Sequence, residues 1–281
     1  MATGQLPATK PLEIGLIPVQ SGTKTPFFCV YGNGRVLAQY LDPDQPVYWF
    51  WSSHHCELHQ LSHSASIEEI AAFYLKEIKR IQPEGPYLIG GFCVGASIAY
   101  EIAQQLKREN QQVPLLTLID PWRPGPVPLS VKVIRELNKT SQIDGYLKKI
   151  SYLSNKATTL SRRAISRFLK KFGYHKILGK QTSPKPSSVY VHPTATKALV
   201  YYQPQPYKDP VLLFWPGQRE IIHMRKKQLD PPAHWIKLLT GDIKTFSIPE
   251  AGHEQLFDEL NAQDIARQLN KHLRDYHVIA V

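Results

Sequence analysis

Gly91-Phe92-Cys93-Val94-Gly95 has the small-x-nucleophile-x-small pattern that joins a strand to a helix in one large class of α/β proteins. The preceding residues, 86–90, are typical of a short buried strand, and residues 96–103 are typical of a helix. Cys93 therefore lies on a sharp turn, a nucleophile elbow. We expect Gly91 and Gly95 to let strand and helix approach closely, and the helix N-terminus to favour a thiolate at Cys93.

Short apolar runs and amphipathic helical patterns alternate along the chain. The helical patterns cover residues 67–81, 97–109 and 262–276. Alternation of this kind predicts an α/β fold with a mostly parallel, seven-stranded sheet flanked by helices, in a single domain spanning residues 1–281. The expected strands are 14–19, 26–31, 47–51, 87–90, 115–119, 211–215 and 245–248.

The alternation stops after the fifth expected strand, and the basic charge of the chain is concentrated there. The chain carries a formal net charge of +11. Fifteen Lys or Arg residues, against only Glu136 and Asp144, lie between Arg123 and Ser187. Prolines open and close this stretch, so we expect residues 124–190 to form an inserted, basic helical lid.

A base and an acid follow Cys93 in the order that α/β-hydrolases use. Asp120 ends the fifth expected strand, which places it at the carboxyl edge of a parallel sheet, beside the elbow. His253 lies in a loop of small residues after the last strand, at the same edge. We expect Cys93 as nucleophile, His253 as general base and Asp120 as its orienting acid, with Glu220 as a minor alternative acid.

Attack by a nucleophile on an acyl group creates an oxyanion that needs two N–H donors. The backbone of Val94, the residue after the nucleophile, is expected to supply one. For the second we expect Asn33, in the turn Tyr31-Gly32-Asn33-Gly34 that follows an early strand. An ordinary Gly-Asn-Gly turn is the alternative interpretation.

Other features of the sequence argue against a membrane-spanning or exported protein, a disulfide framework and a metal site. No apolar run is long enough to span a membrane and no signal layout is present, so we expect a cytoplasmic protein. Cys29, Cys56 and Cys93 have no repeated spacing and are expected to be free thiols. The histidine-rich segment 54–63 lacks a metal signature, so we expect neither a metal nor a bound cofactor.

With these residues in place, the chain resembles the thioesterase domains that release products from nonribosomal peptide synthetases and polyketide synthases. The resemblance runs from residues 14–22 through 26–32 and 46–48 to the elbow, Asp120, the lid and Gly252-His253. It implies transfer of an acyl chain from the phosphopantetheine thiol of a carrier protein to the nucleophile, then release by hydrolysis, cyclisation or transfer to an amine or hydroxyl. The chain could be a stand-alone enzyme or a domain of a larger synthase; the lead-in 10–20 resembles the family's linker after a carrier, which favours the domain.

The chain departs from the family pattern at two positions. The family most often has serine where this chain has Cys93, and often has His-Gly where this chain has Tyr31-Gly32. Transfer from a carrier thiol to Cys93 would exchange one thioester for another, so the acyl group would keep its transfer potential. We expect this to favour release by a demanding acceptor over simple hydrolysis.

Two other functions fit the same residues. A free-standing esterase or lactone hydrolase would need no carrier, and a noncatalytic binding protein would form no covalent adduct. The expected partner is an acidic carrier protein that docks near the basic lid. The helical segment 160–172 within the lid has two other interpretations: its charges form the solvent-exposed face of an amphipathic helix, or they bind an acidic membrane surface. Nucleic acid is not expected, since no nucleic-acid motif accompanies the charge.

Overall fold

A computed structural model of the 281-residue chain describes residues 16–50, 65–125, 193–217 and 231–274. The predicted lid at 124–190 lies almost wholly outside these ranges, as do Cys56, the histidine-rich segment 54–63 and Glu220. The predictions made for them, and the single-domain boundary 1–281, stay predictions.

The predicted seven-stranded sheet is present and is parallel except at one edge. Its strands are β1 (Leu16–Gln20), β2 (Phe27–Val30), β3 (Val47–Phe50), β4 (Leu88–Phe92), β5 (Leu115–Ile119), β6 (Val211–Pro216) and β7 (Ile243–Ile248). They lie in the order β1-β3-β2-β4-β5-β6-β7. Only β1 runs antiparallel to its neighbour, β3. The central strands β2, β4, β5 and β6 are buried along their whole length, which is why each is a continuous apolar run in the sequence.

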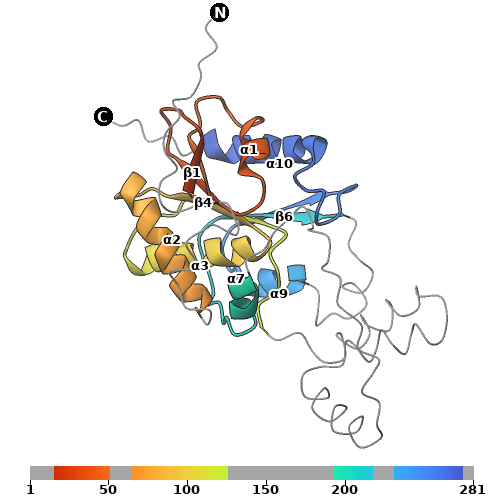
Figure 1. Ribbon diagram of the computed structural model, residues 1–281. Helices are drawn as coiled ribbons and strands as arrows, with labels where there is room; N and C mark the ends of the chain where they lie inside the picture. The colour runs from red at the N-terminus through yellow and green to blue at the C-terminus, as the bar shows by residue number, and fades with distance from the viewer. Residues whose placement is uncertain (1–15, 51–64, 126–192, 218–230, 275–281) are drawn as a thin grey trace, which may run out of the picture. The chain divides into compact units, whose positions relative to one another are not determined.

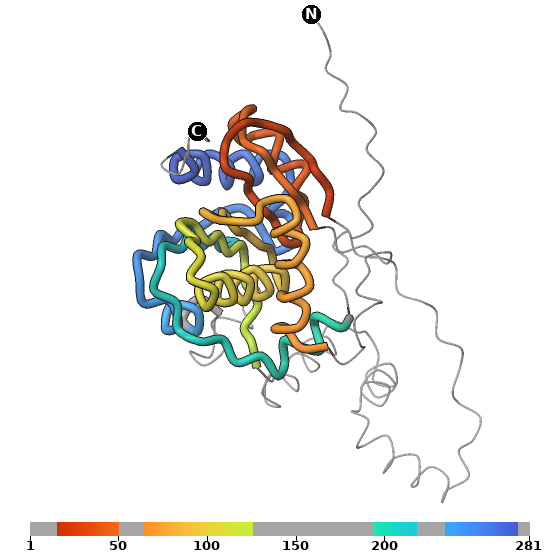
Figure 2. The backbone as a smooth tube through the Cα atoms, turned by 90° about the vertical axis from the view of Figure 1, so that its left-hand side faces the viewer, coloured from red at the N-terminus to blue at the C-terminus, as the bar shows by residue number. Residues whose placement is uncertain are grey.

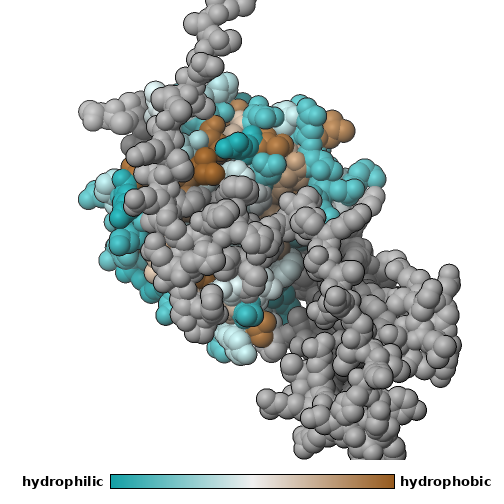
Figure 3. Space-filling view, in the orientation of Figure 1, coloured by the Kyte–Doolittle hydropathy of each residue, from teal (hydrophilic) through white to brown (hydrophobic). Residues whose placement is uncertain are grey.

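Helices cover both faces of the sheet (Figure 1). On one face lie α2 (Ile67–Ile81), α3 (Val94–Arg108), α7 (Pro193–Leu199) and α9 (Pro231–Leu238), and on the other lie α1 (Gly34–Ala38) and α10 (Glu259–Leu273). Figure 2 shows the same two helical layers from the side. In Figure 3, hydrophilic residues cover most of the outer surface of α2 and α10, as their amphipathic patterns predict.

The structure moves several predicted boundaries. Strand β4 continues through two glycines to Phe92, because it pairs with β5 as far as Phe92 and Ile119. The Phe27 ring packs against Gly90, where a Cβ would come within 2.5 Å of it. Helix α3 begins at Val94, three residues before the predicted start at residue 97. Helices α1, α7 and α9 were not predicted, since five to eight residues are too few to show a helical period.

Capping defines where α2 begins. The Ser66 side chain accepts a hydrogen bond from the Glu69 N–H, and the Glu69 carboxylate accepts one from the Ser66 N–H. This reciprocal capping box satisfies two helix N–H groups that would otherwise lack partners. The helix then buries one apolar face against α3. None of the helices in the described ranges is long and apolar enough to cross a membrane.

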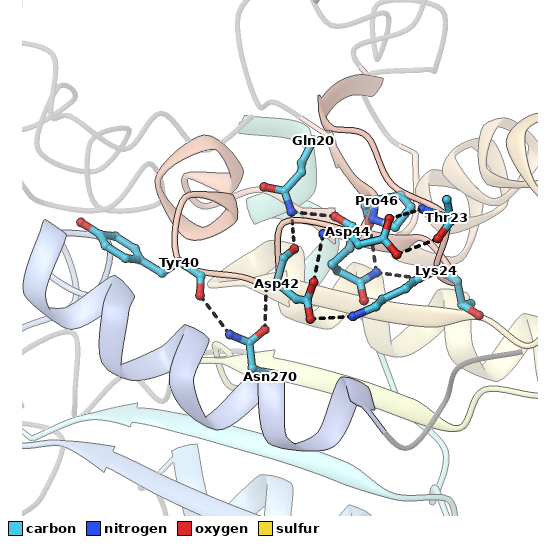
Figure 4. A network of polar contacts seen from close by, with 10 residues as sticks. Gln20, Thr23, Lys24, Tyr40, Asp42, Asp44, Pro46 and Asn270 are labelled. Atoms are coloured by element: carbon cyan, nitrogen blue, oxygen red, sulfur yellow. Dashed lines mark hydrogen bonds and ion pairs between the residues drawn. The ribbon is translucent and has the colours of Figure 1, made fainter. Parts of the chain in front are cut away.

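A polar network attaches the loops beside β1 to α10 (Figure 4). The Asn270 amide donates to the Tyr40 carbonyl at 2.9 Å and accepts from the Asp42 N–H at 3.0 Å. The Asp42 carboxylate in turn pairs with Lys24 at 2.6 Å, and this pairing holds the pKa of Asp42 below its usual value. Asn270 thus links α10 to the backbone of Asp42, which lies 228 positions earlier in the sequence.

We expect Asn270→Ala to lower the free energy of unfolding by about 1–2 kcal/mol, because it removes two hydrogen bonds and leaves partly buried backbone groups unpaired. Gln263→Ala, at an exposed position of the same helix, is the matched control and should change stability by less than about 0.5 kcal/mol. Urea denaturation measures both. Equal effects of the two substitutions would show that the network does not stabilise the fold.

Candidate active site

Cys93 lies at the turn between β4 and α3 with a left-handed backbone, at φ 59° and ψ −124°. Such a conformation is uncommon for a residue other than glycine and costs about 1–3 kcal/mol. The turn is held by the Cys93 N–H, which donates to the Ile119 carbonyl at 3.0 Å, and by the Cys93 carbonyl, which accepts from the Ala96 N–H at 3.2 Å. The sequence pattern of an elbow thus has the backbone geometry of one.

The two elbow glycines lie where the backbone leaves no room for a side chain. A Cβ at Gly91 would come within 2.3 Å of the Gly95 carbonyl oxygen. A Cβ at Gly95 would come within 2.4 Å of the Val30 carbonyl oxygen. Both obstacles are backbone atoms that cannot move aside cheaply, so helix, elbow and β2 can pack this closely only with glycine at 91 and 95.

Asp120 and His253 are brought together from positions far apart in the sequence. Asp120 directly follows β5, and His253 lies in the loop after β7, so both are at the carboxyl edge of the sheet. The distance from His253 Nδ1 to Asp120 Oδ2 is 2.5 Å. The Asp120 backbone, with φ 41°, is held by its N–H, which donates to the Phe214 carbonyl at 2.8 Å. The structure thus brings Asp120 and His253, which the sequence predicts as acid and base, into direct contact.

Aromatic rings hold the His253 imidazole. The Phe92 ring stacks on it, with the ring centroids 4.8 Å apart and the planes inclined by 20°. The Trp122 ring also lies near the His253 imidazole, and the centroids of these two rings are 6.2 Å apart. Phe92 directly precedes Cys93 and Trp122 lies two residues after Asp120, but nothing in the sequence indicates that their rings meet a histidine far along the chain.

Burial opposes the thiolate that the helix N-terminus is predicted to favour at Cys93. Only 1% of Cys93 is exposed, and this burial raises the pKa of its thiol well above the ordinary value. The Asp120 charge raises the pKa further, while a hydrogen bond from the Val94 N–H acts in the opposite direction but does not prevail. Nucleophilic attack by Cys93 therefore requires a base to remove its proton.

The loop predicted to supply the second oxyanion donor passes beside the elbow. Tyr31 and Gly32 both have positive φ, at 64° and 72°. Gly32 is pressed against Phe257 and Phe92, where a Cβ would come within 2.6 Å and 3.1 Å of their side chains. Asn33 caps α1, its side chain accepting from the Val36 N–H at 3.3 Å. Within the described part of the chain, the Asn33 backbone N–H donates no hydrogen bond.

The site has the groups for acyl transfer through a covalent intermediate. A thiol, an imidazole and a carboxylate lie at one edge of the sheet, with the Val94 N–H beside the thiol. In the described ranges, no three His, Cys, Asp or Glu side chains are arranged to hold a metal ion.

Comparison with solved structures identifies proteins that share this fold. Several solved structures share the fold at less than 25% identity. The four-domain nonribosomal peptide synthetase AB3403 has a TM-score of 0.60 at 21% identity, covering 92% of this chain and 20% of that one. The type II thioesterase YbtT of yersiniabactin biosynthesis has a TM-score of 0.54 at 16% identity, covering 94% and 100%. The NocB thioesterase domain of the nocardicin cluster has a TM-score of 0.51 at 18% identity, covering 90% and 95%. The chain therefore has the α/β-hydrolase fold found in thioesterases.

Comparison of amino-acid sequences finds one protein family and several synthases that match parts of this chain. Residues 35–132 match the model of the thioesterase domain family. Orsellinic acid synthase of Emericella nidulans is 41% identical over 80 residues, or 28% of this chain and 4% of that protein. Malpibaldin synthetase of Mortierella alpina is 34% identical over 106 residues, or 36% and 2%. Chondramide synthase of Chondromyces crocatus is 34% identical over 120 residues, or 39% and 3%.

Over residues 35–132 the chain is thus similar to the thioesterase domain family, and it shares stretches of sequence with large synthases and synthetases. It spans only a few per cent of the length of these three relatives, between 2% and 4%.

The protonated thiol gives a pH prediction. Because burial raises the pKa of Cys93, we expect its alkylation by iodoacetamide to accelerate by close to tenfold per pH unit between about pH 7 and 9, without a plateau. Mass spectrometry of the Cys93 peptide measures the rate, and Cys93→Ala identifies the background from other cysteines. A rate that is already constant below about pH 7 would indicate a resting thiolate and contradict this assignment.

Proposed function

We propose that this chain releases an acyl, peptidyl or polyketide chain from a carrier protein through an acyl-enzyme on Cys93. The observation that carries the proposal is the 2.5 Å hydrogen bond between His253 and Asp120 at the edge of the sheet where the elbow presents Cys93. A base oriented by an acid beside a buried thiol is the arrangement that nucleophilic acyl transfer needs. The likeness to thioesterase domains supplies the class of substrate.

In the acylation step, His253 Nε2 takes the proton from the Cys93 thiol as Sγ attacks the thioester carbonyl carbon. The new Sγ–C bond pushes the carbonyl electron pair onto the oxygen, and the N–H groups of Val94 and Asn33 stabilise the resulting oxyanion. Collapse of this intermediate breaks the bond to the phosphopantetheine sulfur, which leaves with the proton that His253 carries. No cofactor bound to this chain takes part.

In the release step, His253 takes a proton from water, a hydroxyl or an amine as that acceptor attacks the acyl group on Cys93. The acceptor displaces Sγ, which recovers its proton from His253. Since the intermediate is a thioester, it retains the transfer potential of the carrier-bound chain, and an amine or an internal ring-closing group competes well with water.

Asp120 acts on the base. Its carboxylate accepts the hydrogen bond from His253 Nδ1, which leaves Nε2 as the nitrogen that exchanges protons with Cys93 and the acceptor. The same negative charge disfavours a thiolate and stabilises an imidazolium. It therefore adds to the burial that raises the pKa of the thiol, and it assists proton transfer when substrate is present.

The partner in this account is an acyl or peptidyl carrier protein. Such carriers are typically acidic, so the positive charge concentrated between Arg123 and Ser187 would accelerate their association in a salt-dependent way. This segment lies outside the described residues, so the docking surface itself stays a prediction.

A release assay with an acyl chain on a carrier's phosphopantetheine arm tests the proposal. The unchanged protein should release the chain, and faster than it hydrolyses a small ester of the same acyl group. Cys93→Ala should lower the rate by about 10³-fold or more, because the covalent route is lost. Cys93→Ser should form an oxoester and shift the product toward free acid, or stall as an acyl-enzyme. Chromatography of the products and intact-mass measurement of the protein give both readings.

The arms of this assay separate the alternatives. Faster turnover of the small ester would favour a free-standing esterase, and the absence of both turnover and adduct would favour a binding protein. An unchanged rate and product distribution in Cys93→Ser would refute the reason offered for the thiol.

A further inference from the structure

Trp49 contacts both ends of the loop that passes beside Cys93. It lies on β3 and is 7% exposed. At one end of the loop, the indole Nε1–H of Trp49 donates to the Tyr31 carbonyl at 3.2 Å. At the other end, the ring is pressed against Gly34, where a Cβ would come within 2.6 Å of the Trp49 Cγ. A single buried side chain therefore fixes the two ends of the turn 31–34.

Cys29 makes a second contact with the same carbonyl. Its Sγ lies 3.5 Å from the Tyr31 oxygen. Cys29 is fully buried, which raises the pKa of its thiol to about 12 and keeps the S–H available as a donor at neutral pH. The Tyr31 carbonyl thus receives two donors from the interior, one from β3 and one from β2.

Holding this carbonyl sets the direction of the next N–H. Because the peptide unit is planar and trans, the Gly32 N–H points away from the side on which the Tyr31 carbonyl is held. The backbone that follows is in the left-handed region at both Tyr31 and Gly32, a conformation that needs external contacts to persist at a tyrosine. The contacts from Trp49 and Cys29 supply them.

The loop so held contacts the neighbours of Cys93 on both sides. Tyr31 lies against Gly95, where a Cβ would come within 2.8 Å of the Tyr31 Cβ. Gly32 lies against the Phe92 Cβ. A shift of the loop would therefore change the position of its N–H groups relative to the nucleophile.

We propose that Trp49, assisted by Cys29, is a positioning residue that presets the loop N–H groups for the oxyanion. The proposal rests on the proposed function, because an oxyanion forms only if Cys93 attacks an acyl carbonyl. In that step the carbonyl electron pair moves to oxygen, and donors that are already in place cost no reorganisation. The contacts of Trp49 with Tyr31 and Gly34 are contacts with the loop, so in this proposal it acts through the loop.

The test compares Trp49→Phe with a matched control. Phenylalanine keeps a ring against Gly34 and removes only the indole N–H. Trp235→Phe makes the same chemical change at a fully buried tryptophan whose Nε1 has no hydrogen-bond partner in the described part of the chain. We expect Trp49→Phe to lower kcat for the acyl thioester by about 10- to 100-fold, less than deleting a donor outright, with KM within about twofold. Trp235→Phe should leave both constants within about twofold.

Two inhibitors separate positioning from general damage. A trifluoromethyl ketone that forms a hemithioketal with Cys93 carries an oxyanion, so Trp49→Phe should weaken its binding by the same factor as kcat. Iodoacetamide forms no oxyanion, so its rate with Cys93 should be unchanged. Parallel losses of kcat and of alkylation would overturn the proposal, as would a kcat within about twofold of the unchanged protein.

Cys29 provides a second variant should Trp49→Phe fold poorly. Cys29→Ala should lower kcat by about threefold and Cys29→Ser, which restores a donor, should recover it. Equal effects of the two substitutions would overturn the assisting role. If the unchanged protein forms no acyl-enzyme at all, it is the proposed function that fails; if it does and Trp49→Phe keeps full kcat, only this inference fails.

Discussion

The left-handed backbone at Cys93 is the constraint on which the rest of this structure depends. A cysteine with φ 59° is held in place only because β4 runs without interruption to Phe92, α3 begins at once at Val94, and glycines at 91 and 95 remove the Cβ atoms that would collide with backbone. The same turn brings the Cys93 thiol to the carboxyl edge of the sheet, where β5 and β7 deliver Asp120 and His253. The cost of the strained residue is of the order of 1–3 kcal/mol, met by the buried strands around it.

Burial decides how the nucleophile is used. Burial of the Cys93 thiol, which is 1% exposed, raises its pKa and so disfavours a thiolate, and the nearby Asp120 charge acts in the same direction. In the proposed mechanism, the Asp120–His253 pair makes the thiol reactive when an acyl group can accept the developing charge. The Phe92 ring stacks on the His253 imidazole, so the residue before Cys93 helps to hold the proposed base in place.

The sequence was sufficient for the sheet and the elbow, because most of the parallel strands are buried, continuous apolar runs, and it placed Asp120 and His253 at one edge, because both follow the carboxyl ends of parallel strands. It was insufficient where long-range packing decides. Gly90 and Gly91 resemble the end of a strand, yet the Phe27 ring fills the space and β4 continues. The pairing of Phe92 with His253 joins residues far apart in sequence. The thiolate prediction did not include the effect of burial, because a helix N-terminus can be recognised in a sequence, whereas the extent of burial at Cys93 cannot.

The most direct measurement is to find which atom carries the acyl group during turnover. The protein is mixed with a carrier-bound acyl thioester, quenched in acid within one turnover, digested, and its peptides are sequenced by mass spectrometry. The account predicts the acyl mass on the peptide that contains Cys93, as a thioester that neutral hydroxylamine removes. An acyl group on any other residue, or chain release with no acylated peptide at any time, would contradict it.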